Sequence, residues 1–120
     1  MKECAQRIAN EVQSKHLKAN PFGKLDPSRR WDHCLVSCRI SRECKGGIIT
    51  AIIAGDWFQD PWWQDPRTTL SDPWDRIANK VGRKLSSSSD SCCEQACTKE
   101  FNDGGIPNRP KKYLLFLLDN

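Results

Sequence analysis

The sequence WDHCLVSC at residues 31–38 and the sequence CCEQAC at residues 92–97 decide the fold. Both segments contain two cysteines four residues apart, namely Cys34 and Cys38 in the first and Cys93 and Cys97 in the second. Side chains with this spacing lie on one face of an α-helix, so two antiparallel helices can be joined by two parallel disulfides. The geometry favours the pairs Cys34–Cys97 and Cys38–Cys93. Each bridge closes a long loop, which stabilises the folded state by about 4 kcal/mol in the chain-entropy model.

Three of the seven cysteines, Cys4, Cys44 and Cys92, are not assigned a partner by this geometry. Cys44 and Cys92 lie just outside the two segments, and we expect them to form a third bridge, with Cys4 left over. The alternative is zinc, for which His33 and the cysteines would supply ligands, but their spacing differs from the short knuckles of structural zinc sites. Buried free thiols are a third interpretation. We expect disulfides, and we predict neither a metal site nor a cofactor.

The length of the chain, 120 residues and 13.7 kDa, suits one small domain with a modest core. No stretch approaches the eighteen or so apolar residues of a transmembrane helix. Met1 and Lys2 lead into Glu3 and Cys4 without an apolar segment, so no signal peptide is expected. Because the cysteines nevertheless indicate an oxidising compartment, we expect this chain to be part of a longer exported protein.

Hydrophobic spacing and the signals for helix ends predict a mostly α fold of about five helices. The predicted helices span residues 3–19, 27–44, 48–58, 73–85 and 91–101. Residues 48–58 could also form a buried strand, but the length of the segment and the paired glycines before it favour a helix. Asp26-Pro27 and Asp72-Pro73 are each typical of a cap followed by proline at the first helical position, and Asp90 can cap the last helix. Paired glycines at 46–47 and 104–105 are typical of helix ends.

The remaining segments are predicted to be irregular. Residues 61–73 contain three prolines and should form a loop, and residues 86–89 are four serines that resemble a linker. Residues 113–118 (YLLFLL) form an apolar tail. The chain is thus expected to be a single domain, residues 1–120. It would comprise an N-terminal helix and linker (1–25), a disulfide-laced helical core (26–101) and a tail (102–120).

The charge pattern argues against nucleic-acid binding. The net charge is +4, and the first 45 residues carry ten basic and five acidic side chains. Residues 46–82 carry three basic and five acidic side chains, and four of the five tryptophans lie among them. A nucleic-acid binder usually places its aromatic residues within a basic stripe, whereas here they accompany the acids.

His33 is the leading candidate for a catalytic side chain. It lies on the cysteine-laced helix, which would hold it rigidly, as a general base requires. Asp60, Asp75 and Asn79 are expected to orient the imidazole or the substrate, because carboxylates near a histidine orient its ring and stabilise the imidazolium. The alternative is that these residues have only structural roles. Asp75, for example, is favoured by the dipole in the first turn of its helix.

Three tryptophans lie at the end of the apolar segment at residues 48–58 or shortly after it, and they are expected to contact a substrate or a membrane, namely Trp57, Trp62 and Trp63. Indole side chains are favoured at the interface between lipid and water. Residues 48–55 and 113–118 could also insert into a membrane together, although neither segment is long enough to span it.

Several short strings resemble the variable C-terminal region of RHS-repeat polymorphic toxin proteins of bacteria. They are Trp31-Asp-His-Cys-Leu-Val-Ser-Cys38, Gly46-Gly47, Ala54-Gly55, Asp60 and Asp75-x-x-x-Asn79-x-x-Gly82. The same order without the cysteines is similar to small YfiM-like envelope lipoproteins. The resemblance covers residues 31–97. Where the toxin-associated pattern has Lys-Glu before its acid, this chain has Phe58-Gln59, which shifts the expected carboxylate to Asp60 and Asp56.

The resemblance implies the toxin tip of a secreted antibacterial effector, delivered by a larger carrier into the envelope or periplasm of a target cell. It also implies a cognate immunity protein as partner. The leading expectation is a hydrolase of the cell envelope that depends on His33. The alternatives are a non-enzymatic module that perturbs membranes or binds a partner, and a metal-dependent nuclease that uses the basic N-terminal half.

Overall fold

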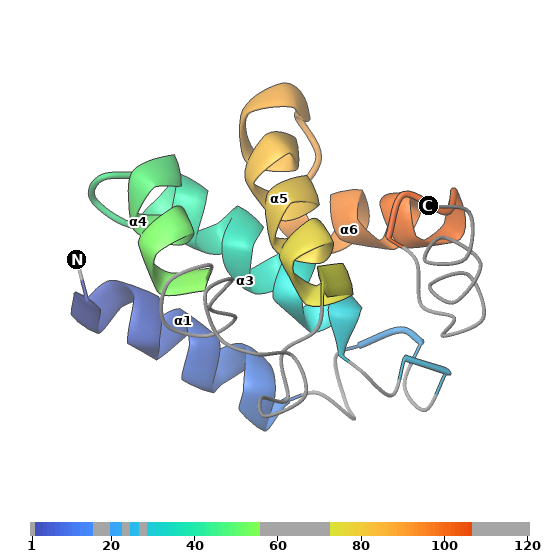
Figure 1. Cartoon of the computed structure of the whole chain (residues 1–120), viewed down its shortest axis with the longest axis horizontal. Coiled ribbons are helices and arrows are strands. Elements are labelled where there is room, and N and C mark those ends of the chain that lie inside the picture. The colour runs from blue at the N-terminus through green and yellow to red at the C-terminus, as the bar shows by residue number, and fades with distance from the viewer. Residues whose placement is uncertain (1, 16–19, 23–24, 27–28, 56–72, 107–120) are drawn as a thin grey trace.

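The computed structural model describes residues 2–15, 20–22, 25–26, 29–55 and 73–106. These residues form five helices and no strand, which confirms the predicted mostly α fold (Figure 1). The helices are α1 (Lys2–Ser14), α3 (Arg30–Glu43), α4 (Ile48–Ile52), α5 (Pro73–Ser88) and α6 (Cys93–Asn102). Of the loop predicted at residues 61–73, residues 61–72 lie outside the described residues, as does the apolar tail, and Pro73 is the first residue of α5.

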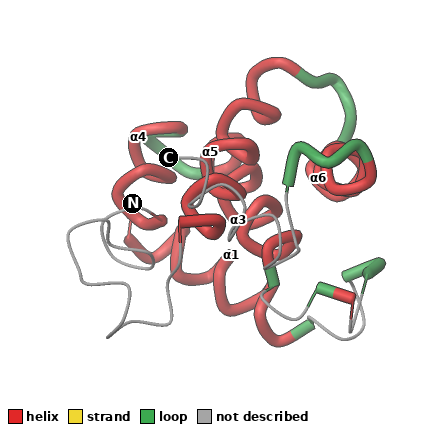
Figure 2. The backbone as a smooth tube through the Cα atoms, turned by 45° about the vertical axis from the view of Figure 1, so that its right-hand side comes forward, coloured by secondary structure: helices red, strands yellow, loops and turns green. Residues whose placement is uncertain are grey.

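Helix α3 lies at the centre of the fold, and each of the other four helices contacts it (Figures 1 and 2). Its buried face meets Ile8 of α1 and the disulfides to α6, and Trp31 is almost fully buried in the same core. The Trp31 indole Nε1–H donates to Thr98 Oγ1 of α6 at 3.1 Å. Beside it, Phe22 stacks on Phe101 with ring centroids 4.0 Å apart. One central helix therefore organises the whole core.

Helix α3 begins three residues later than the sequence predicts. The Asp26 carboxylate still binds it, accepting the backbone N–H groups of Arg30 at 3.0 Å and Trp31 at 2.8 Å. Arg29 has a left-handed backbone with φ 56°, which an α-helix excludes, so the helix cannot begin earlier. Asp26 is fully buried and also accepts a hydrogen bond from Asn20 Nδ2 at 3.0 Å. The N-cap residue of α3 is Arg29, so the predicted N-cap position and the predicted first residue are both wrong, although the Asp26 carboxylate does bind two of the first N–H groups of the helix.

The other helix ends differ from the prediction for local reasons. Helix α1 ends at Ser14, and α4 continues into one π-helical turn at residues 53–55. Helix α5 extends through Ser88, because the hydroxyls of the first three serines of the predicted linker donate back to the carbonyls of Arg83 and Lys84. The N-cap of α6 is Cys92, and not the predicted Asp90.

Three disulfides join the helices, and two of them are the predicted pairs. Cys34–Cys97 and Cys38–Cys93 connect α3 to α6 with Cα–Cα distances of 6.0 Å and 5.8 Å. The predicted third pair, Cys44–Cys92, is wrong: Cys44 binds Cys4 of α1, and Cys92 is a free, exposed thiol. Adjacent residues on a helix point about 100° apart, so Cys92 does not share the face of Cys93 and Cys97. Packing of α1 on α3 brings Cys4 to Cys44 instead.

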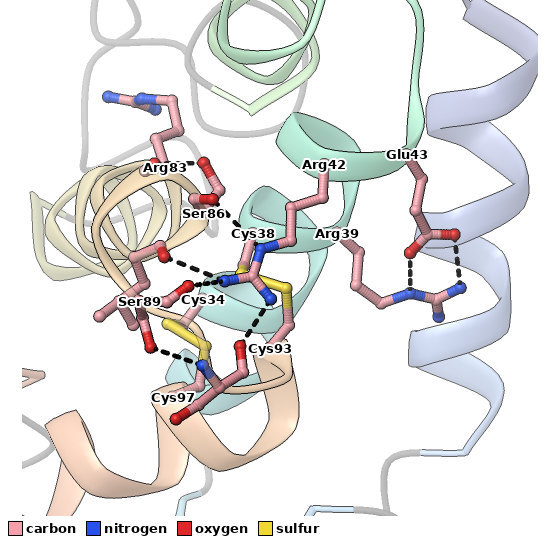
Figure 3. The surroundings of a disulfide bond; sticks show 12 residues. Cys34, Cys38, Arg39, Arg42, Glu43, Arg83, Ser86, Ser89, Cys93 and Cys97 are labelled. Atoms are coloured by element: carbon pink, nitrogen blue, oxygen red, sulfur yellow. Dashed lines mark hydrogen bonds and ion pairs between the residues drawn. A yellow bond between two sulfur atoms is a disulfide. The ribbon is translucent and has the colours of Figure 1, made fainter.

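The Arg42 side chain holds the chain segment between α5 and α6 against α3 (Figure 3). Its guanidinium donates to four backbone carbonyls, those of Leu85 at 3.3 Å, Ser86 at 3.2 Å, Ser89 at 2.6 Å and Ser91 at 2.7 Å. Leu85 and Ser86 belong to the last turn of α5, where carbonyls lack partners within the helix and a cation is favoured. Arg42 is therefore a C-terminal cap supplied by a different helix.

A second arginine of α3 connects the helix to α1. Arg39 donates to Glu43 Oε2 at 2.7 Å and also contacts Glu11 of α1 at 3.4 Å. The hydrogen bond from Arg39 lowers the pKa of the Glu43 carboxyl below its ordinary value, and the same bond raises the pKa of Arg39. Since exposed ion pairs contribute at most about 1 kcal/mol, this network orients α1 more than it stabilises the fold.

Gly82 is the point of closest approach between α5 and α3. A Cβ atom at this position would overlap the carbonyl oxygen of Cys34 and would lie 2.9 Å from Ser37 Cβ and 3.0 Å from Cys38 N. Two of these three atoms are backbone atoms of a disulfide-bonded helix, so they cannot move away cheaply. Glycine is therefore required here for the packing of the two helices.

We expect Gly82→Ala to destabilise the protein by about 2 kcal/mol. Overpacking costs about 1–3 kcal/mol, and the backbone atoms at this site place the cost at about 3 kcal/mol. Subtracting the gain of about 1 kcal/mol in helix propensity leaves a net loss of about 2 kcal/mol. Urea unfolding without reductant measures the change. Ser87→Ala, on the exposed side of the same helix, serves as the control and should change stability by less than about 0.5 kcal/mol. A Gly82→Ala variant as stable as the parent would contradict the crossing described here.

The three disulfides should be reduced in a defined order. Cys4 is half-buried, whereas Cys34, Cys38 and Cys97 are fully buried. Because a reducing thiol must reach a sulfur atom, a mild reductant should open Cys4–Cys44 first. Alkylation of the released thiols followed by peptide mass spectrometry measures the order in which the bridges open. Cys92, which is already a free thiol, should be labelled before any reductant is added. Earlier loss of a bridge between α3 and α6 would show that exposure does not control reactivity here.

Candidate functional site

His33 lies in the first turn of α3 with a half-buried side chain. Its backbone N–H donates to Arg29 O at 3.0 Å. The residue before it, Asp32, is buried, and the residue after it, Cys34, is tied to α6. The backbone of His33 is therefore held at both sides, and part of its imidazole still reaches solvent, as the chemistry of a general base requires.

Helices α3 and α5 run in the same direction where they cross. Gly82 lies against Cys34 and Cys38, and further along both helices Arg42 binds the carbonyl of Leu85. The N-terminal half of α5 consequently lies beside the N-terminal half of α3 (Figure 1). This parallel crossing brings Asp75 and Asn79 to the end of α3 that carries His33. The side chain of Asp75 lies outside the described part of the structure.

Asn79 is buried, with 2% of its surface exposed. It faces the end of α4, because a Cβ atom on Gly55 would lie 3.1 Å from Asn79 Nδ2. The two residues come from different strings of the motif set, Ala54-Gly55 and Asp75-x-x-x-Asn79-x-x-Gly82. Packing therefore explains the two glycines of these strings. Gly55 leaves room for the Asn79 amide, and Gly82 leaves room for the backbone of α3.

The other predicted site residues are not described by the structure. Asp60, Asp56 and the three tryptophans expected to contact a membrane, Trp57, Trp62 and Trp63, fall within residues 56–72. Among the described residues, no group of three histidine, cysteine, aspartate or glutamate side chains is arranged to hold a metal ion. Six of the seven cysteines are used in disulfides.

The sequence predicts that the apolar residues 48–55 could insert into a membrane, but it did not reveal that α4 has one buried and one exposed face. The inner face of this helix is made by Thr50 and Ala51, which are buried. The outer face exposes 65% of Ile49, 41% of Ile48 and 39% of Ile53. The apolar segment IITAIIAG by itself predicts burial. Its small residues at positions 51 and 54 are the signal for the side that faces the core, and the isoleucines then lie on the opposite, exposed side.

A second missed feature is the basic outer face of α5. Residues 76–88 contain four basic side chains and no acidic one, namely Arg76, Lys80, Arg83 and Lys84. Around this helix, Gly82 faces α3 and Asn79 faces α4, so Lys80 and Lys84 lie on the remaining side and are exposed. The spacing of Arg76, Lys80 and Lys84 by four residues is the sequence signal that could have revealed this face.

Comparisons of the chain with protein-family models, with curated proteins and with solved structures find no match.

Three disulfides indicate that the protein folds in an oxidising setting, either extracellular or periplasmic. None of the described helices is both long and apolar enough to cross a membrane.

Proposed function

We propose that this chain is the effector domain of a secreted antibacterial toxin and that it acts in the cell envelope as a hydrolase dependent on His33. The observation that carries the proposal is the parallel crossing of α3 and α5, which brings the predicted residues Asp75 and Asn79 to the end of α3 that carries His33. The resemblance to the RHS-associated toxin region supplies the biological class, with a cognate immunity protein as partner.

The proposed mechanism assigns a separate role to each residue. His33 takes a proton from water as the water oxygen attacks the carbonyl carbon or phosphorus of an ester, phosphoester or amide in an envelope component. The bond to the leaving group then breaks, and the imidazolium gives its proton to the leaving oxygen or nitrogen. Asp75 orients the imidazole and stabilises the imidazolium that forms. Asn79 is buried against Gly55, so it acts as a positioning residue that sets α4 relative to α5. Asp60 is the second candidate carboxylate.

The disulfides support the envelope as the site of action. The two bridges between α3 and α6 hold the backbone of His33 only where they stay oxidised, and a reducing cytosol would remove them. The protein should therefore be active in the periplasm and much less active in the cytosol. This setting also agrees with delivery by an exported carrier.

We expect His33→Ala to abolish growth inhibition when the protein is directed to the periplasm of a susceptible bacterium. The fold should persist, because the His33 side chain is half-buried and lies outside the disulfide core. Colony counts measure the effect, and far-UV circular dichroism with disulfide mapping verifies the fold. His16→Ala, which replaces the only other histidine, is the matched control. Undiminished killing by a folded His33→Ala protein would rule out catalysis by this residue and favour a non-enzymatic toxin.

A further inference from the structure

We infer that the outer faces of α4 and α5 together form a docking surface for an anionic lipid bilayer. This surface is defined by the isoleucines Ile48, Ile49 and Ile53 of α4 and the lysines Lys80 and Lys84 of α5. It is separate from the His33 site and does not depend on any catalytic activity.

The two faces belong to neighbouring helices on the same side of α3. Helices α4 and α5 contact each other, and the Asn79 amide meets Gly55 at the end of α4 (Figures 1 and 2). Thr50 and Ala51 form the buried inner face of α4. Gly82 lies on the inner face of α5, which packs against α3. The isoleucines and the lysines are therefore on the outward sides of two adjacent helices.

The isoleucine face is too apolar to be an ordinary solvent-exposed helix surface. Ile49 is 65% exposed, and its two neighbours on this face are each about two-fifths exposed. Helix α4 carries no charged residue, and it is too short to span a bilayer. An apolar helix face of this kind is suited to the boundary between headgroups and acyl chains, where it can be buried without crossing the membrane.

The positive charge of the lysines next to the isoleucine face favours a negatively charged partner. The charged side chains that the structure describes on α5 are all basic, and Lys80 and Lys84 are both exposed. Within the described residues, neither ammonium group has an acidic partner. Lysines beside an apolar face match anionic lipid headgroups. A nucleic acid would match the lysines but would leave the isoleucines exposed, so an anionic bilayer is the better partner.

Sedimentation with lipid vesicles tests this surface directly. The oxidised protein is mixed with vesicles of phosphatidylcholine alone or with vesicles containing equal parts of phosphatidylcholine and phosphatidylglycerol. We expect binding to the anionic vesicles that weakens as salt is added. Removing both lysine charges by Lys80→Gln with Lys84→Gln should weaken this binding roughly thirty-fold, since each lysine near such a surface contributes about 1 kcal/mol, or roughly fivefold in affinity.

Matched variants separate the two parts of the surface. Ile49→Ser should weaken binding to anionic vesicles by roughly tenfold through lost apolar burial. Lys15→Gln with Lys99→Gln removes the same charge from exposed positions on other parts of the protein and should leave binding nearly unchanged. Equal binding to both vesicle types, or an equal loss in this control, would overturn the inference. Binding to DNA or RNA in place of vesicles would overturn it as well.

The same assay distinguishes this inference from the proposed function. His33→Ala should bind anionic vesicles as the parent protein does, even though it no longer inhibits growth. A lysine variant that loses vesicle binding while hydrolysis of a soluble substrate persists would support a docking role. No vesicle binding by a parent protein that still kills through His33 would remove the docking surface and leave the hydrolase proposal intact.

Discussion

The two parallel disulfides between α3 and α6 are the constraint on which the rest of this structure depends. They join residues more than fifty positions apart in the chain, and they fix the register of α6 along α3. Their sulfur atoms are fully or almost fully buried and occupy part of the core that larger aliphatic side chains fill in other small domains. A chain with only 38% hydrophobic residues can therefore keep a single folded arrangement without a large apolar interior.

Much of this fold was predictable because its strongest signals are local. The spacing of four between paired cysteines predicts both the helices and two of the bridges, and Asp26 marks the start of α3 through its carboxylate. The third bridge was not predictable, since the partner of Cys44 depends on how α1 packs across α3. The serines at 86–88 were misjudged for a similar reason. Their hydroxyls bond within α5, and the Arg42 guanidinium satisfies the carbonyls at the end of that helix.

The candidate site shows a different balance between sequence and structure. The sequence predicts His33, Asp75 and Asn79 as site residues from residue type and spacing, but it could not show that α3 and α5 run in the same direction. The close approach of these two helices depends on Gly82, whose missing side chain lets the two backbones touch. The exposed isoleucines of α4 escaped prediction because an apolar segment ordinarily signals burial on all sides. Only the packing of Thr50 and Ala51 shows that half of this helix remains uncovered.

The contacts of Arg42 have a consequence for how this protein can evolve. All four of its acceptors are main-chain oxygens, so the anchor is indifferent to which side chains the stretch from residue 85 to residue 91 displays. Side chains that point outward from this stretch can therefore change without loss of the four contacts. The Arg42 side chain thus fixes the path of the backbone and leaves the chemistry of the exposed surface above it open to change.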